Sequence, residues 1–114
     1  MAIENGPGIR NVRLVLCTMI AITVQLTGQT LAQDQAKIEA GEAIFNDYCS
    51  TCHGQNLVSS GQTFDLRRLT ANDRARFQNS VLYGKNQMPP WKGVLGDEQI
   101  DQLWHYIRNN TYEK

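Results

Sequence analysis

Two cysteines and a histidine stand close together in the stretch "YCSTCHG", at Cys49, Cys52 and His53. Three kinds of chemistry use these residue types at close spacing: a thiol–disulfide redox pair, part of a zinc site, and the covalent attachment of a haem. In the third, both thiols form thioethers with the haem vinyl groups, and the adjacent histidine binds the iron.

The zinc and dithiol interpretations fit the rest of the chain poorly. Zinc takes about four nitrogen or sulfur ligands, and His105 is the only further one beyond residue 33. Three ligands packed at Cys49, Cys52 and His53 are also poor geometry for a tetrahedron. A redox pair usually opens a helix within a βαβ pattern, and no stretch after residue 33 alternates apolar and polar residues convincingly. Haem attachment uses all three residues, so the sequence favours it.

A second iron ligand is predicted in the segment "GKNQMPPWKG", residues 84–93, at Met88. A methionine often only fills a gap in a core. Met88, however, is bracketed by glycines and prolines instead of lying on an amphipathic face, and Pro89 and Pro90 stiffen its loop. His/Met ligation raises the reduction potential and leaves no open site on the iron. We therefore expect electron transfer instead of substrate activation.

The N-terminal third is typical of a secretory signal peptide. Arg10 and Arg13 precede an apolar run from Leu14 to about Leu26, and Thr30-Leu31-Ala32 fits a small-x-small cleavage pattern. We expect residues 1–33 to be a signal peptide cleaved near residue 32 or 33, and the protein to be periplasmic. An uncleaved membrane anchor is the alternative, but the run of about 13 apolar residues is short of the roughly 20 that a spanning helix needs.

Residues 34–114 are predicted to form one domain. The chain has 11 Lys and Arg against 11 Asp and Glu, a balance that indicates no nucleic-acid partner. A domain of about 80 residues is only marginally self-supporting. A buried haem would supply the apolar centre that such a domain lacks. Cys17 lies in the apolar run and is expected to be lost with the signal peptide.

Three helices are expected around this centre, and no strand, which makes the fold all-α. The first covers residues 34–48, with Ile38, Gly41, Phe45 and Tyr48 on one face. A mid-helix glycine costs about 1 kcal/mol relative to alanine. Gly41 on the apolar face therefore suggests that another backbone, most simply that of the last helix, comes close.

The other two helices follow from capping residues and apolar spacing. One is expected from Thr70 to Gly84, with Thr70 or Asn72 as its cap and with Phe77 and Val81 facing inward. The last begins at Asp97 and Glu98, since acidic residues favour a helix N-terminus. Its apolar stripe consists of Ile100, Leu103, Trp104 and Ile107. His105 points away from that stripe and is expected to be a solvated surface residue.

Taken together, these motifs resemble the class I c-type cytochromes over nearly all of residues 36–110. The matching residues are Gly41-x-x-x-Phe45, Cys49-x-x-Cys52-His53-Gly54, Met88-Pro89-Pro90-Trp91 and Leu103-x-x-Tyr106. The resemblance implies a small cytochrome c fold around one covalently attached haem c. It also implies that the first and last helices cross near Gly41, with Gly41 and Phe45 meeting Leu103 and Tyr106.

One feature departs from this family. Its members commonly have a proline in the loop after the haem motif, whose carbonyl accepts the ring N–H of the ligand histidine. Beyond residue 33 the only prolines here are Pro89 and Pro90. Ligand histidines are usually oriented by such a bond, so we expect another backbone carbonyl between Asn56 and Thr63 to accept it.

The loop "NLVSSGQTFDLRRL" together with "NQMPPWKGVL" also looks like cytochromes that serve PQQ-dependent alcohol dehydrogenases. The function expected is that of an exported, monomeric one-electron carrier, not an enzyme. It would link a periplasmic dehydrogenase, for which the resemblance suggests this quinoprotein kind, to an oxidase or another cytochrome of the respiratory chain. It would meet the membrane only if the signal peptide stays uncleaved. The alternatives are a haem-based sensor or peroxidase-like protein with a displaceable distal ligand, and a structural or assembly subunit.

Four arginines cluster between the haem motif and Met88: Arg67, Arg68, Arg74 and Arg76. At least two are expected to be ordinary solvated residues. Arg67 or Arg68 suits pairing with haem propionates, because the guanidinium binds carboxylates bidentately. The cluster also suits docking to an acidic partner.

Overall fold

The computed structural model describes the backbone of residues 10–113, with side chains from residue 28 onward. The chain divides into two compact units, Met1–Gln33 and Asp34–Lys114. The expected signal peptide falls in the first. Residues 1–9 and the side chains of residues 10–27, Cys17 included, lie outside the described residues, so the signal peptide stays a prediction. No helix of the described part of the chain is long and apolar enough to cross a membrane.

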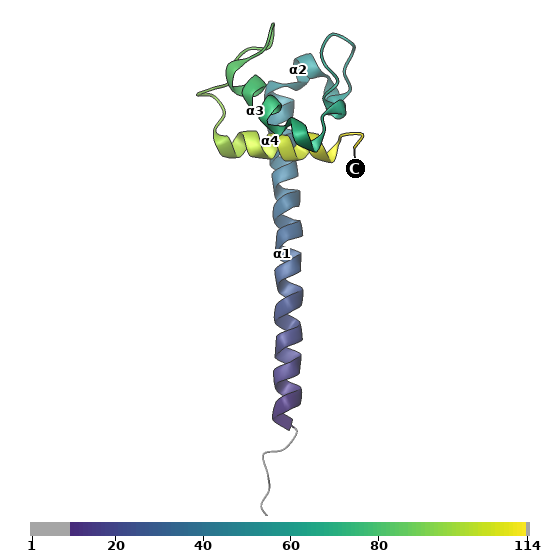
Figure 1. Cartoon of the computed structure of the whole chain (residues 1–114), viewed down its shortest axis with the longest axis vertical. Coiled ribbons are helices and arrows are strands. Elements are labelled where there is room, and N and C mark those ends of the chain that lie inside the picture. Colours follow the sequence, from purple (N-terminus) through teal and green to yellow (C-terminus); the bar gives the residue numbers. More distant parts are fainter. Residues whose placement is uncertain (1–9, 114) are drawn as a thin grey trace, which may run out of the picture. The chain divides into compact units, whose positions relative to one another are not determined.

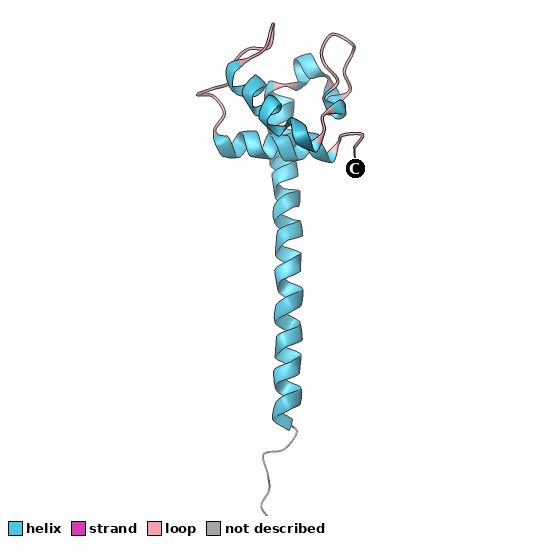
Figure 2. Ribbon diagram, in the orientation of Figure 1, coloured by secondary structure: helices cyan, strands magenta, loops and turns pink. Residues whose placement is uncertain are grey.

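The fold is helical. Residues 10–113 contain four α-helices: α1 (Arg10–Tyr48), α2 (Ser50–His53), α3 (Arg74–Tyr83) and α4 (Asp97–Asn109). Three short 3-10 turns, η1 (Gln55–Leu57), η2 (Leu66–Arg68) and η3 (Ala71–Asp73), interrupt the loop between α2 and α3 (Figures 1 and 2). Residues 10–113 contain no strand, only isolated bridges between Lys85 and Met88 and between Lys92 and Leu95. The expectation of a small helical fold is confirmed.

The helix boundaries differ from expectation at one place. The first helix was expected to start near Asp34. In the structure α1 already begins at Arg10 and continues through Asp34 without a break. Between Arg10 and Asp34 the sequence has no proline and a single glycine, Gly28, so nothing there interrupts a helix. The other boundaries agree within a few residues.

Helices α1 and α4 cross at Gly41 (Figure 1). A Cβ atom on Gly41 would lie 2.6 Å from the carbonyl carbon of Gln102 and 2.8 Å from the Cβ of Tyr106. Next to this contact, the rings of Phe45 and Tyr106 pack with their centroids 5.5 Å apart. The crossing of the first and last helices at this glycine is therefore confirmed, and it places the end of α1 against the core.

The core forms where α3 and the stripe of α4 meet the end of α1. The rings of Phe77 on α3 and Trp104 on α4 lie 5.0 Å apart. The buried apolar residues are Ile44, Phe45, Leu57, Leu69, Phe77, Val81, Leu95, Ile100, Leu103, Trp104, Tyr106 and Ile107. All four stripe residues expected on α4 are among them.

Tyr48 differs from its expected place on the buried face of α1. Its side chain is 43% exposed, and its ring packs edge-on against Trp91 with centroids 5.3 Å apart. The helix ends at Tyr48, so no further turn of it continues along the core. Ile44, which was not expected, is buried instead.

Both ends of α3 have the capping residues that the sequence predicted. Oδ2 of Asp73 accepts hydrogen bonds from the backbone N–H and the hydroxyl of Thr70, at 2.8 and 2.9 Å. This cap starts η3, which leads directly into α3. At the other end Gly84 has a φ of 76°, a left-handed conformation that favours glycine and ends the helix before the segment with Met88.

Candidate haem site

One cavity of about 760 Å³ opens between the end of α1, α2, α3, α4 and two loops. Its volume lies in the ~300–1,000 Å³ range of small-molecule and cofactor sites. Cys49, Cys52, His53 and Met88 all line it. Much of the remaining wall is apolar or aromatic: Phe45, Tyr48, Phe64, Leu66, Leu69, Phe77, Val81, Trp91, Leu103 and Ile107. The structure thus brings the four predicted site residues to one largely apolar space.

The cysteines and the histidine are placed by the turn between α1 and α2. The N–H of Cys49 still donates to the carbonyl of Phe45 at 2.8 Å, and the N–H of His53 donates to that of Cys49 at 2.9 Å. Both Cys49 and Cys52 are free thiols. Burial, aided by Cys52, raises the pKa of the Cys49 thiol to about 11. Reactive redox thiols have lowered pKa values, so this environment disfavours the dithiol interpretation.

The imidazole of His53 is half-buried and carries an unpaired polar atom. Nδ1 is buried and has no partner with full hydrogen-bond geometry. Burial lowers the pKa of His53, and the backbone of Phe64, close to the ring, raises it and partly offsets that shift. A carbonyl is the backbone group that stabilises a ring N–H. The backbone group beside the ring is therefore that of Phe64, one residue beyond the expected range from Asn56 to Thr63, and no hydrogen bond to Nδ1 is formed.

The loop after His53 turns back sharply to reach this position. Asn56 and Leu57 have φ angles of 53° and 63°, although neither is glycine, and Leu57 is fully buried. The hydroxyl of Thr63 donates to the carbonyl of Cys52 at 3.2 Å and so fixes the far end of the loop to α2. Two consecutive left-handed residues are uncommon, and no sequence signal predicted them.

The segment with Met88 is closed by backbone hydrogen bonds. Lys85 and Met88 exchange N–H···O bonds of 3.1 and 2.9 Å around a turn in which Asn86 has a φ of 54°. Further along, the N–H groups of Trp91 and Lys92 donate to the carbonyls of Val81 and Leu82, in the last turn of α3, at 2.9 and 3.1 Å. The segment is therefore held at both ends by main-chain bonds, and the ring of Trp91 packs against Tyr48 as well.

These residues fit a haem c. Two free thiols and an imidazole come from one side of the cavity, and a thioether comes from the loop after α3. The buried Nδ1 of His53 has no hydrogen-bond partner, and an unsatisfied ring nitrogen of this kind is consistent with an imidazole that faces a bound metal cofactor. The apolar walls would enclose the macrocycle.

The basic residues at the cavity differ from those favoured by the sequence. Arg67 is held by Asp65 through Nε at 3.0 Å and stacks on Tyr112. By contrast, Arg76 and Lys85 line the cavity. The guanidinium of Arg76 also pairs with Asp73 at 3.1 Å. Lys85 was missed, although its place between Gly84 and the methionine turn was a usable signal.

Neither Arg74, at the start of α3, nor His105, on α4, lines this cavity. Nη2 of Arg74 pairs with Asp101 at 2.9 Å. His105 is half-buried, and its Nδ1 lies 2.8 Å from the carbonyl oxygen of Asp101. The expectation of a solvated histidine was therefore only partly right, because a helix places residues i and i+4 on one face.

The sequence matches the family described as "Cytochrome C oxidase, cbb3-type, subunit III" over residues 36–107. The chain belongs to this family of cytochrome c domains. Cytochrome c6 of Gracilaria tenuistipitata var. liui is 33% identical to the cytochrome over 102 residues, covering 85% of this chain and 89% of the relative. Cytochrome c6 of Thermosynechococcus vestitus is 35% identical over 100 residues, 82% of this chain and 85% of the relative.

Larger proteins also contain a similar domain. Quinohemoprotein alcohol dehydrogenase ADH-IIG of Pseudomonas putida is 35% identical over 85 residues, which are 73% of the cytochrome but 12% of that enzyme. A solved structure of the same dehydrogenase matches with a TM-score of 0.64 and 36% identity, covering 69% of this chain and 12% of that one. The cytochrome therefore spans only a small part of these dehydrogenases. Membership of the family implies a haem c cofactor and an electron-carrying role.

Proposed function

We propose that the chain is an exported monohaem cytochrome that carries single electrons from a dehydrogenase, in particular a quinoprotein alcohol dehydrogenase, to the respiratory chain. The observation that carries the proposal is that Cys49, Cys52, His53 and Met88 line one apolar cavity. When bound, the haem would supply an Fe(III)/Fe(II) couple.

Each residue has a distinct role in this proposal. Cys49 and Cys52 tether the haem through thioether bonds. His53 and Met88 would bind the iron from the imidazole and the thioether, and no position would then be left for a substrate. The loop with Thr63 and Phe64 would hold the cavity wall beside the imidazole, and the apolar walls would keep water from most of the macrocycle. The four ligating and tethering groups therefore hold the cofactor, and the exposed rim of the cavity is left for electron exchange.

The partner is inferred from two relatives. Quinohemoprotein alcohol dehydrogenases contain a domain similar to this cytochrome. In a separate chain, the same kind of domain would accept electrons from such an enzyme in solution. We take the carrier to be monomeric, periplasmic and free of its signal peptide, with cleavage near residue 32 or 33.

A redox-titrated absorption spectrum of the exported protein tests the cofactor assignment. The haem should remain attached after acid-acetone extraction, and the oxidised protein should show a methionine–iron charge-transfer band. Met88→Ala should lose that band and keep the attached haem, while Cys52→Ala should weaken attachment. Absence of the band in the wild type would refute His/Met ligation.

Two further measurements test the rest of the proposal. Mass spectrometry of the exported protein should give a mature N-terminus at residue 33 or 34 and one haem. Stopped-flow mixing with a reduced quinoprotein alcohol dehydrogenase should reduce the cytochrome. A haem-loaded protein that is reduced by other dehydrogenases but not by this class would refute the named partner alone.

A further inference from the structure

The end of the chain lies against the loop that forms one wall of the cavity. This loop, residues 63–71, contributes Thr63, Phe64, Leu66 and Leu69 to the cavity lining. Its regular structure is limited to η2 and the start of η3. Residues 108–113, which we name the C-terminal strap, cover it from the end of α4 onward.

Backbone groups of the loop find their partners in the strap. The N–H of Tyr112 donates to the carbonyl of Arg67 (2.9 Å), Nη1 of Arg108 to the carbonyl of Leu69 (2.7 Å), and the N–H of Ala71 to Oε2 of Glu113 (3.0 Å). Alternate loop residues, Arg67, Leu69 and Ala71, are thus bonded to the strap through their backbone groups. Since backbone polar groups away from water need partners, the strap takes the place of a neighbouring strand.

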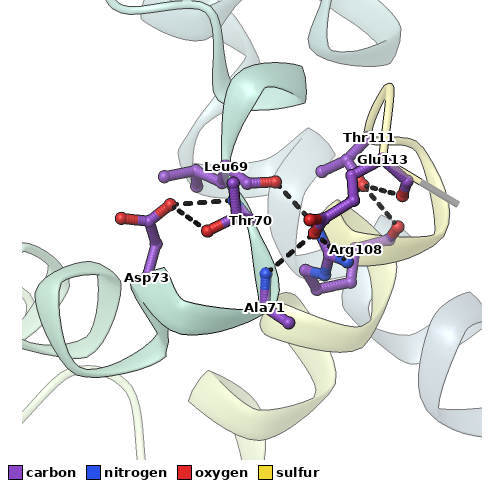
Figure 3. A network of polar contacts seen from close by, with 7 residues as sticks. All are labelled: Leu69, Thr70, Ala71, Asp73, Arg108, Thr111 and Glu113. Carbon is purple, nitrogen blue, oxygen red and sulfur yellow. Dashed lines mark hydrogen bonds and ion pairs between the residues drawn. The ribbon is translucent and has the colours of Figure 1, made fainter.

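Arg108, the first residue of the strap, is at the centre of its hydrogen-bond network (Figure 3). Besides Leu69, its guanidinium donates to Thr111 Oγ1 at 3.0 Å and to Glu113 Oε2 at 2.9 Å. Thr111 is only 2% exposed, and its hydroxyl is close to the carbonyls of Arg108 and Glu113, at 3.0 Å each. Bonds to charged groups are stronger than those between neutral groups, so Arg108 and Glu113 hold both the strap's shape and its grip on the loop.

The opposite side of the same loop faces the haem motif. Thr63 donates to the carbonyl of Cys52 at 3.2 Å, and the backbone of Phe64 lies close to the ring of His53. Asp65, the next residue, is bonded to the hydroxyl of Tyr112 at 3.2 Å. The strap and His53 are therefore two neighbours of one short loop.

We propose that Arg108 and Glu113 are positioning residues for His53: by fixing the loop 63–71, they keep Thr63 bonded to the carbonyl of Cys52 and so hold the cavity wall beside the imidazole. The inference goes beyond the proposed function and depends on it only in that His53 is the residue facing the cofactor. A loosened loop would change the surroundings and the orientation of the imidazole, because the loop is bonded to the residue before His53 and lines the same cavity.

The test compares Arg108→Ala with Arg74→Ala in the full-length, exported protein. Both changes remove an arginine whose guanidinium is ion-paired, but the guanidinium of Arg74 pairs with Asp101 on α4, whereas that of Arg108 bonds to the loop and to the strap. Amide hydrogen exchange at Ala71 and Tyr112 measures the grip of the strap, and the NMR resonances of the His53 ring measure its surroundings. In Arg108→Ala exchange should accelerate roughly tenfold or more and the His53 resonances should shift. In Arg74→Ala neither should change.

Two outcomes would overturn the inference. Faster exchange with unmoved His53 resonances would make the strap a purely structural support. Equal changes in both variants would reflect general destabilisation. If Arg108→Ala fails to fold, the half-exposed Glu113 provides a second pair: Glu113→Ala should reproduce both effects, and Glu113→Gln, which keeps an acceptor for Ala71, should restore most of the wild-type behaviour.

The two proposals fail separately. Both readouts are recorded on the haem-loaded protein, so a wild type that holds its haem but exchanges no electrons with a dehydrogenase would refute the proposed function alone. With haem attached, the reduction potential adds a third readout, which should shift in Arg108→Ala and stay at the wild-type value in Arg74→Ala. An unshifted potential together with unmoved His53 resonances would refute the positioning role alone.

Discussion

Gly41 of α1 lies against the main chain of Gln102 in α4, with no room for a side chain between them. The groups that a Cβ would meet are the carbonyl of Gln102 and the Cβ of Tyr106, both close to the α4 backbone. Neither can rotate away as the end of a long side chain could. Any residue larger than glycine must therefore push the two helices apart.

Gly41→Ala should destabilise the protein by about 1–3 kcal/mol, the usual cost of overpacking. Alanine's better helix propensity, worth about 1 kcal/mol, would work in the opposite direction, so a net loss would show that the crossing dominates. Denaturant unfolding measures the change. Gly96→Ala is the control, because its nearest neighbour would be Gln99 Oε1 at 3.8 Å. Equal stability of the two variants would contradict the tight crossing.

Gly84→Ala should disturb the segment with Met88. A Cβ at Gly84 would lie 3.0 Å from the nitrogen of Pro90 and close to the carbonyl oxygen of Met88. Gly93→Ala is a matched control, because Gly93 also has a positive φ, of 83°, but has open space around it. Both variants incur backbone strain of order 1 kcal/mol, but only Gly84→Ala should weaken the charge-transfer band. A band unchanged in both would mean that the segment adapts to the added carbon.

Arg76→Gln and Lys85→Gln should slow electron exchange with an acidic partner. Both residues line the cavity and so place positive charge where a partner would approach. The bimolecular rate at low ionic strength should fall several-fold, and the difference should vanish at high salt, because salt screens such attraction. Arg68→Gln, at an exposed position outside the cavity lining, is the control. A rate independent of salt in the wild type would exclude this steering.

Stability should depend on pH through Asp101. The hydrogen bond from Lys37 lowers the pKa of Asp101 most, burial opposes this, and Arg74 adds to the lowering. Because the folded-state pKa lies below the unfolded one, the ionised carboxylate stabilises the fold above about pH 4. That contribution is lost as the pH falls below 4 through the folded pKa.

Asp101→Asn should accordingly be less stable than the wild type at pH 7, and the difference should shrink towards pH 2. Thermal unfolding across this range, with Asp47→Asn at an exposed position of α1 as control, gives the comparison. A constant difference at all pH values would mean that Asp101 acts through packing instead of its charge.

Spacing predicted the helices and the cavity well, because these depend on local signals. Periodicity placed the stripe of α4 and the pair Phe77 and Val81, and the lone glycine on an apolar face indicated the crossing at Gly41. The residue types in the haem motif and the bracketed Met88 also predicted that these groups would come together at one cavity. The roles assigned to them remain proposals.

Other features depend on long-range contacts that no local pattern encodes. Tyr48 has the right phase for burial, but the helix ends there, so its ring lies half outside. The sharp return of the loop at Asn56 and Leu57 brings Phe64, not a residue before it, to His53. Which arginine reaches the cavity depends on where each neighbouring aspartate lies, as Asp65 holds Arg67 while Arg76 stays at the cavity.

The segment between α3 and α4 is closed by main-chain bonds, from Lys85 to Met88 and from Trp91 and Lys92 back to the end of α3. Its exposed side chains, such as Gln87 and Lys92, take no part in those bonds. Surface residues here can therefore change during evolution without moving Met88. A lineage of such proteins could acquire new docking specificities while conserving the redox centre, since the two properties depend on separate atoms of the same ten-residue stretch, "GKNQMPPWKG".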